Sequence, residues 1–94
     1  MTLRKGMTTF LRSDLIGFYE WPVDGELNNR LSGEPDDSEF NRNNGYEVLY
    51  MIRHLMSAQN TLSTEAGHEL EMMIKVAPTG LKTQRQMKDW VISN

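Results

Sequence analysis

Histidine and carboxylate side chains are the residues of this chain that could bind a metal, and their spacing tests for such a site. Glu65 and His68 form a Glu-x-x-His pair on one face of a predicted helix, the spacing found in carboxylate-bridged di-metal bundles. Such a site needs a second pair and two further glutamates. Glu47 and His54 stand seven residues apart and do not provide it. We therefore expect no metal and no cofactor, and we expect both histidines to be exposed surface residues.

The usual signatures of catalysis are also missing from the sequence. The chain has no cysteine, which excludes disulfides, thiolate metal sites and cysteine nucleophiles. It contains no Gly-x-Ser-x-Gly motif, Walker loop, His-Glu-x-x-His motif or dinucleotide fingerprint. The acids of residues 20–39 stand in turn-rich sequence, which positions side chains poorly for acid/base work. We expect a protein that is not an enzyme, and a small enzyme or a metal-binding helical protein is the least favoured alternative.

The polar start of the last predicted helix offers a nucleic-acid alternative. Residues 65–77, 78–82 and 83–92 follow a helix, turn, helix order, and in DNA-binding proteins of that type the second helix enters the major groove by its N-terminal residues. The side chains that suit base edges and phosphates are Lys82, Thr83, Gln84, Arg85 and Lys88. Against this hypothesis stand the net charge of -3 and the acids of the preceding helix, Glu65, Glu69 and Glu71. A helix-turn-helix DNA-binding regulator that uses the helix at 83–93 is therefore the second hypothesis.

Aromatic and thioether side chains could bind a protein partner. Phe18, Tyr19 and Trp21 form an aromatic group, which in a small domain serves either as a core anchor or as a binding hot spot. Met72 lies off the apolar stripe of its helix, and methionine both fills cores and lines adaptable binding surfaces. We predict that partner contacts come from Phe18, Tyr19, Trp21, Met72, Arg85 and Trp90.

Three helices are predicted to position these side chains, near residues 46–59, 64–77 and 83–93. The first has apolar residues over more than half of its circumference, so it should be the central helix, covered from more than one side. The second has one narrow apolar stripe, formed by Ala66, Leu70, Met73, Ile74 and Ala77. That stripe leaves the polar side chains facing outward, namely Glu65, His68, Glu69, Glu71 and Lys75. The turn between the first two helices is short, which predicts antiparallel packing.

Capping residues mark the ends of these helices. Asn44-Gly45 favours a helix boundary over a hairpin turn, because no alternating strand follows it. Ser63 or Thr64 can cap the second helix, and Pro78 cannot continue it. Residues 83–86 read Thr-Gln-Arg-Gln, which matches a capping box.

The section before the first of these helices has weaker signals. Apolar residues at helical spacing predict a helix over residues 8–19 with Thr8 as its N-cap, and a strand over residues 16–21 is the alternative because of its aromatic residues. A two-turn helix between Asp24 and Gly33 is also indicated. Residues 22–44 are otherwise expected to form an acidic loop region. Residues 20–39 contain seven acids and one arginine, a net charge of -6, so the rest of the chain carries +3 of the total -3.

The length and composition indicate one small folded domain. Its 94 residues suffice for a single core, and 38% hydrophobic and 24% charged residues are typical of a globular protein. We expect residues 1–94 to form one domain, with residues 1–6 as a flexible tail and residues 45–94 as the helical core. The predicted fold is mainly α, a small bundle of three to four helices whose last two form a helix-turn-helix-like hairpin. A core this small makes a homodimer plausible.

The size, lack of cysteine and charge separation, with a second methionine at position 7, resemble the small accessory proteins of enterobacterial temperate phages. The resemblance implies a protein that acts without catalysis by binding a host or phage protein and altering its activity. The longest apolar runs are too short for a signal peptide or a membrane span. We therefore expect a cytoplasmic, non-enzymatic adaptor or inhibitor, with no membrane partner and with nucleic acid as a less favoured one.

Overall fold

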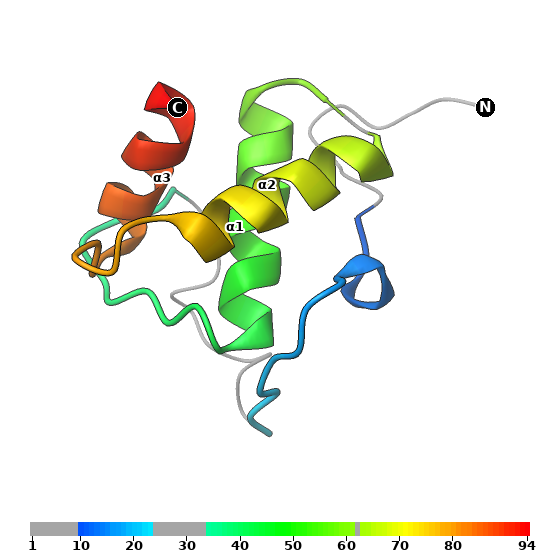
Figure 1. The fold of residues 1–94 in the computed structure, drawn as a ribbon, viewed down its shortest axis with the longest axis horizontal. Coiled ribbons are helices and arrows are strands. Elements are labelled where there is room, and N and C mark those ends of the chain that lie inside the picture. The colour runs from blue at the N-terminus through cyan, green and yellow to red at the C-terminus, as the bar shows by residue number, and fades with distance from the viewer. Residues whose placement is uncertain (1–9, 24–33, 62) are drawn as a thin grey trace.

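The computed structural model describes residues 10–23, 34–61 and 63–94. These residues contain three α-helices and no strand (Figure 1): α1 (Gly45–Ala58), α2 (Thr64–Val76) and α3 (Gln84–Ser93). A short 3-10 helix, η1 (Arg12–Asp14), precedes them. The predicted class, a mainly α small helical bundle, is confirmed, and the three predicted helices agree with the observed ones to within one residue at each end.

Helix α1 is the central helix of the bundle. The side-chain oxygen of Asn44 caps it by accepting hydrogen bonds from the backbone N–H groups of Tyr46 and Glu47, at 2.9 and 3.3 Å. After the helix, Asn60 takes a left-handed conformation with a φ of 54°, which asparagine tolerates better than most residues. The apolar residues of α1 that are buried are Val48, Leu49, Met51, Ile52, Leu55 and Met56. Both α2 and α3 contact α1, as the width of its apolar surface predicts.

The caps of α2 and α3 are those that the sequence indicates. Ser63 Oγ accepts a hydrogen bond from the backbone N–H of Ala66 at 3.1 Å. The capping box of α3 is confirmed, because Thr83 Oγ1 accepts from the N–H of Gln86 while the Gln86 side chain accepts from the N–H of Thr83, both at 3.1 Å. Helix α2 ends before Pro78, which lacks the N–H that would continue it.

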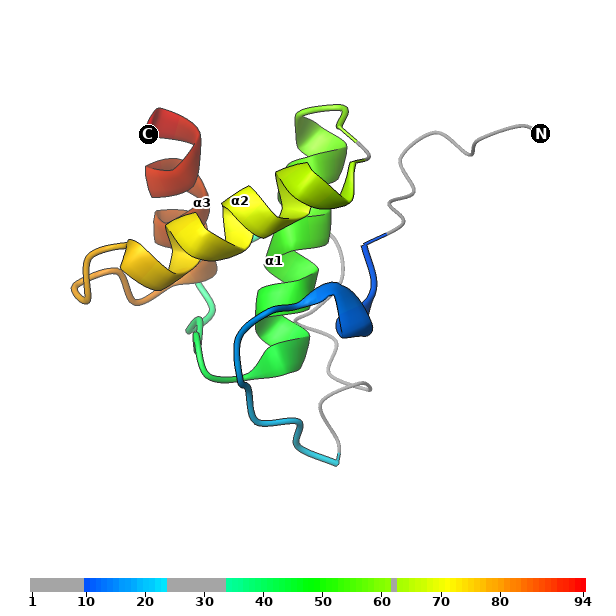
Figure 2. The ribbon, with the colours of Figure 1, turned by 45° about the vertical axis from the view of Figure 1, so that its right-hand side comes forward.

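The relative direction of α1 and α2 differs from the prediction. In both ribbon views α2 crosses α1 obliquely (Figures 1 and 2), so the antiparallel packing predicted from the short turn was wrong. The buried residues of α2 are Gly67, Leu70, Glu71 and Ile74. The predicted stripe members Ala66 and Met73 are only half-buried.

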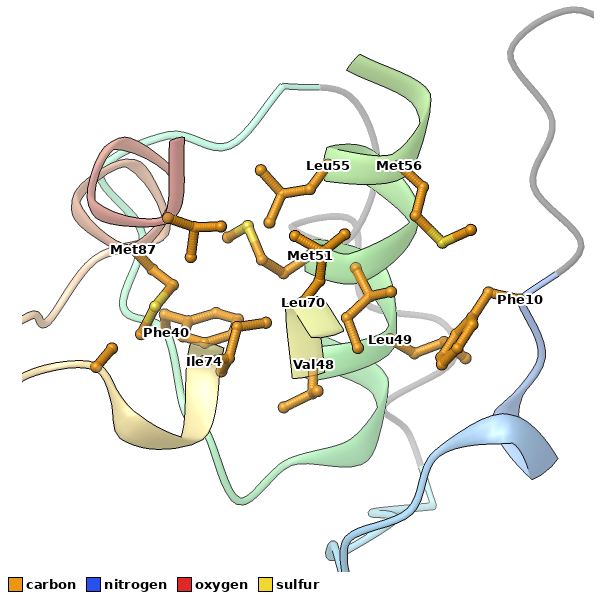
Figure 3. Close-up of a cluster of buried hydrophobic side chains, with 13 residues drawn as sticks. Phe10, Phe40, Val48, Leu49, Met51, Leu55, Met56, Leu70, Ile74 and Met87 are labelled. Carbon is orange, nitrogen blue, oxygen red and sulfur yellow. The ribbon is translucent and has the colours of Figure 1, made fainter. Parts of the chain in front are cut away.

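The hydrophobic core extends beyond the three helices. Phe10 lies at one end of the buried cluster and Met87 and Phe40 lie at the other (Figure 3). Phe10 has 0% and Phe40 has 6% of its surface exposed, although both residues precede α1. Two segments of the N-terminal half therefore complete the core that residues 45–94 begin.

The helix predicted over residues 8–19 was wrong for the described residues 10–19. Beyond the single turn of η1 the chain is extended to Trp21, and the alternative strand is reduced to one isolated parallel bridge between Glu20 and Asn44. The side chain of Glu71 on α2, rather than a helical turn, satisfies the backbone N–H groups of Ile16 and Gly17. Thr8, the two-turn helix between Asp24 and Gly33, and the tail at 1–6 lie outside the described residues.

The acidic loop region at 22–44 is irregular over its described residues 22–23 and 34–44. Its end is tied to the end of α2 by Arg42, whose guanidinium donates to the carbonyl oxygens of Ile74 and Ala77, at 3.3 and 2.5 Å, and to that of Pro78. A guanidinium at this position satisfies carbonyl groups that a helix end leaves without partners. This contact fixes the start of α1 next to the end of α2.

Candidate functional site

Residues 10–23 are here called the N-terminal segment, and its residues 15–21 place their side chains alternately toward and away from the helices. Leu15, Tyr19 and Trp21 are half-buried, whereas Ile16 has 63% and Phe18 has 101% of its surface exposed. Alternation of this kind is the period of extended backbone. The segment therefore presents an aromatic and an aliphatic side chain on its outer face.

The carboxylate of Glu71 on α2 holds the middle of this segment. It accepts hydrogen bonds from the backbone N–H groups of Ile16 and Gly17, both at 3.0 Å, and from the Tyr19 hydroxyl at 2.5 Å. Glu71 was predicted to face outward, and that was wrong, because only 1% of its surface is exposed. The extended segment covers the side of α2 that a bundle of three helices alone would leave open.

These contacts set the ionisation of both side chains. Burial raises the pKa of Glu71, but the hydrogen bonds from Ile16, Tyr19 and Gly17 and the charge of Lys75 outweigh burial, so the pKa lies below its ordinary value of 4.5. Burial, the hydrogen bond to Glu71 and the carboxylate charge raise the pKa of Tyr19 well above its ordinary value of 10.0. The pair therefore exists as a carboxylate and a neutral phenol at neutral pH.

The aromatic side chains near the two ends of the segment pack against glycines. The ring of Phe10 lies so close to Gly67 of α2 that a Cβ atom at position 67 would overlap it. The indole of Trp21 lies in the same way on Gly45, the first residue of α1. Each glycine thus allows a close approach that no other residue type would permit.

An arginine is stacked on the second of these aromatic groups. The guanidinium carbon of Arg12 lies 3.9 Å from the centre of the Trp21 ring, and Trp21 meets Tyr46 edge to face with ring centres 4.9 Å apart. On α1, Arg53 Nε donates to the backbone oxygen of Phe10 at 2.9 Å. Arg12 and Arg53 line one open cleft of about 620 Å³, together with Leu11, Leu15, Tyr19 and Trp21. We call it the arginine cleft.

Helix α2 also exposes apolar side chains. Met72 has 55% and Val76 has 69% of its surface exposed, and residues four apart lie on the same face of a helix. They follow Glu71 and Lys75 in the sequence, and these two side chains contact the N-terminal segment at Ile16 and Gly17. The exposed apolar surface of α2 therefore begins beside that segment.

The six predicted partner contacts lie in two separate regions. Phe18, Tyr19 and Trp21 belong to the N-terminal segment and Met72 lies on the adjoining helix, whereas Arg85 and Trp90 belong to α3. Phe18 and Met72 are exposed. Tyr19, Trp21 and Trp90 are half-buried. Four of the six residues thus belong to the N-terminal segment and to the helix that the segment contacts through Tyr19 and Glu71.

Residues 34–40, here called the acidic segment, cover the start of α3. The backbone N–H groups of Gln84 and Arg85 donate to the carbonyl oxygens of Ser38 and Asp36, each at 2.9 Å, and the N–H of Asp36 donates to Gln84 Oε1 at 3.1 Å. The N–H of Phe40 donates to the carbonyl oxygen of Lys82 at 2.8 Å. The donors at the helix start are therefore used by this segment.

The charges of the acidic segment pair with the cations of α3. Asp37 lies 3.0 Å from Arg85, and Glu34 lies 3.2 Å from Lys88. Gln84 is completely buried. Seven residues (77–83) join α2 to α3, whereas a DNA-binding helix-turn-helix has a turn of about three to four residues. The predicted DNA-contacting residues Gln84, Arg85 and Lys88 are thus engaged within the chain, while Lys82 is exposed and Thr83 caps the helix.

Both histidines are half-buried, so the prediction that they are exposed was wrong. His68 Nε2 lies 2.9 Å from the carbonyl oxygen of Asp14, and its ring meets the edge of Phe10. His54 Nε2 lies 3.6 Å from Glu34, and burial lowers the pKa of His54 despite that carboxylate. Within residues 10–23, 34–61 and 63–94, no three histidine or acidic side chains are grouped as they would be around a metal ion.

Sequence reasoning missed the residues that organise this region. Gly67 offered a signal, because glycine inside a helical range costs about 1 kcal/mol relative to alanine and so indicates a packing reason. Glu71 offered little, since it borders the stripe one residue after Leu70. Arg12 and Arg53 offered none, because their proximity depends on the path of the N-terminal segment.

Comparisons with known proteins add no assignment. In the described part of the chain, none of the helices has the length and apolar character needed to span a bilayer. The sequence matches no protein-family model, and no curated protein or solved structure is detectably similar to it.

Proposed function

We propose that the protein is a small, non-enzymatic protein-binding module that contacts its partner through the outer face of the N-terminal segment and the adjoining surface of α2. The observation that carries the proposal is the position of Phe18, whose side chain has 101% of its surface exposed while its neighbours on both sides are fixed to α2. The backbone N–H of Gly17 and the hydroxyl of Tyr19 both donate hydrogen bonds to the carboxylate of Glu71.

The energetics favour this surface as a binding site. A phenylalanine buries about 150–250 Å² when a partner covers it, and the free chain gains nothing from leaving it in water. Its backbone is already held in place, so binding orders little additional chain. Further exposed apolar area comes from Ile16 of the same segment and from Met72 and Val76 of α2, at 63%, 55% and 69% exposure. Aromatic anchors surrounded by such contacts are typical of interface hot spots.

The wider proposal concerns the class of protein. A small accessory protein of the phage or prophage type, which binds a host or phage protein in the host cytoplasm and modulates or inhibits it, is consistent with the length and charge separation of the chain. Self-association into a dimer is part of the same proposal. The DNA-binding alternative has less support, because Arg85 and Lys88 already pair with Asp37 and Glu34.

The test compares capture of partner proteins by the tagged full-length chain and by the variant Phe18→Ser. We expect at least about a tenfold loss of affinity, corresponding to 1.4 kcal/mol, with no change in melting temperature because Phe18 contacts no core residue. Ile92→Ser is the matched control, since Ile92 is an exposed aliphatic residue of α3 at 52%. Equal capture by the wild type and by Phe18→Ser would contradict the proposal.

A gel-shift assay on duplex DNA at low and at physiological salt tests the alternative. Phosphate contacts impose a steep salt dependence, so a DNA-binding regulator would shift the duplex at low salt and release it at the higher concentration. We expect no shift at either concentration. A salt-sensitive shift that is lost in Arg85→Gln would favour the DNA-binding alternative.

A further inference from the structure

We propose that the arginine cleft binds an acidic peptide segment of the partner, with a carboxylate held between Arg12 and Arg53 and an apolar side chain against Leu11 and Leu15. The inference deepens the proposed function and rests on it. It assigns a chemical character to the partner, which the exposed apolar surface alone does not. All four residues line the same open cleft of about 620 Å³.

Both guanidinium groups are positioned by contacts that leave their hydrogen-bonding edges available. The guanidinium carbon of Arg12 lies 3.9 Å from the centre of the Trp21 ring, and a cation held over an aromatic face still has N–H groups to donate to a carboxylate, because the ring attracts the charge as a whole. Arg53 uses only Nε, which donates to the carbonyl oxygen of Phe10. Its two terminal nitrogens have no hydrogen-bond partner among the described residues.

The cations of the cleft are not neutralised by the acids around them. Neither Arg12 nor Arg53 has an ion-pair partner in the parts of the chain that the structure places. Asp14 directs its carboxylate to the N–H of Leu11 at 2.8 Å, and Glu71 directs its own to the N-terminal segment. In contrast, Arg85 on α3 is paired with Asp37. The cleft thus combines two unpaired cations with apolar walls.

The rigid support of the cleft favours tight recognition. Trp21 packs against Gly45 and makes an edge-to-face contact with Tyr46. The Trp21 ring on which Arg12 lies is therefore fixed before any ligand binds. A guanidinium that is already ordered loses less conformational entropy on binding. Its planar fork can donate hydrogen bonds to both oxygens of one carboxylate, which a lysine cannot do in that geometry.

An acidic peptide fits this cleft better than a nucleic acid does. Affinity for nucleic acid comes from many phosphate contacts along an extended basic surface, whereas the cleft offers two cations beside leucine side chains on a chain of net charge -3. A peptide with one or two carboxylates suits the two cations of the cleft, and an apolar side chain beside them suits its leucine walls.

The experiment is a titration of the full-length, ¹⁵N-labelled chain, followed by the side-chain Nε–Hε NMR signals of its arginines. The probe is a short capped peptide of alternating glutamate and leucine, and the matched peptide has glutamine in place of each glutamate. We expect the acidic peptide to shift the signals of Arg12 and Arg53 saturably, and the glutamine peptide to bind at least about tenfold more weakly.

Variants that make the same charge change inside and outside the cleft distinguish a specific site from general electrostatic attraction. We expect Arg12→Gln and Arg53→Gln each to weaken the acidic peptide about tenfold. Arg85→Gln, which makes the same charge change outside the cleft, should leave its affinity within about twofold. Arg12→Lys keeps the charge but loses the fork, and it should behave like Arg12→Gln. Backbone amide signals of α3 that remain unchanged will show that each variant is folded.

Several results would overturn the inference. Equal affinity for the two peptides would exclude carboxylate recognition. If Arg85→Gln weakened the acidic peptide as much as Arg12→Gln does, the binding would depend on net charge alone. Tighter binding of a deoxythymidine decamer, dependent on Arg12 and Arg53, would assign the cleft to nucleic acid instead. If the peptide does not bind while Phe18→Ser still reduces partner capture, the cleft proposal fails and the proposed function stands.

Discussion

Glu71 shows how a single side chain determines the path of a whole segment. A buried carboxylate is costly unless hydrogen bonds replace its hydration, and here two backbone N–H groups and the Tyr19 hydroxyl do so. The same bonds satisfy amide groups of Ile16 and Gly17 that no helix or sheet would satisfy. The segment and the carboxylate therefore stabilise each other.

Replacing this carboxylate should destabilise the fold. Glu71→Gln keeps the size of the side chain but turns one acceptor oxygen into a donor that faces further N–H groups. We expect a loss of about 1–3 kcal/mol in the free energy of unfolding, measured by urea denaturation at neutral pH. Glu69→Gln, on the exposed face of the same helix, is the control and should change stability by less than about 0.5 kcal/mol.

The same residue should make stability depend on pH in the acidic range. The pKa of Glu71 is lower in the folded chain than its ordinary value of 4.5, so its contribution is complete above that value and is lost as the pH falls through the folded pKa. The difference in unfolding free energy between wild type and Glu71→Gln should therefore shrink below pH 4.5. A difference that stays constant on acidification would show that the carboxylate is not the stabilising form.

At the level of elements, α1 and α2 carry glycines where neighbouring aromatic rings must approach. Gly67 lies inside α2, where glycine costs about 1 kcal/mol relative to alanine, and Gly45 is the first residue of α1. The close packing of Phe10 on Gly67 and of Trp21 on Gly45 offsets that cost. These contacts connect the N-terminal segment to two different helices.

Gly67→Ala should therefore destabilise the protein, although alanine is the better helix former. The new methyl group would overlap the Phe10 ring, and overpacking of this kind costs about 1–3 kcal/mol. Thermal unfolding followed by circular dichroism measures the effect. At Gly80 an added Cβ meets nothing within 4 Å, so Gly80→Ala serves as the control. A stabilised Gly67→Ala variant would mean that Phe10 is not packed there.

For the whole molecule, the hydrophobic core extends beyond the three helices. The buried cluster includes Phe10 and Phe40 from the segments that precede α1, and Arg42 joins the acidic region to the end of α2. The acidic segment also neutralises the cations of α3. The arginines of the cleft have no ion-pair partner among the described residues.

A fragment of residues 45–94 should accordingly fail to fold cooperatively. It lacks two buried phenylalanines, each worth about 3–5 kcal/mol, and a domain of this size has a total stability of only about 5–15 kcal/mol. We expect residual helix signal but a broad, non-cooperative thermal transition by circular dichroism. The full-length chain should unfold in one sharp transition, and a fragment as cooperative as the full chain would contradict this view of the core.

The sequence by itself determined the three helices, their caps and the central place of α1. Those features depend on residues close together in the chain, such as Asn44 before Gly45 and the capping box from Thr83 to Gln86. Only the tertiary structure decided the extended path of the N-terminal segment, the burial of Glu71 and the position of Arg12 and Arg53 on one cleft. Those features depend on contacts between residues more than 40 positions apart, and local periodicity carries no information about which distant carboxylate or glycine a segment will meet.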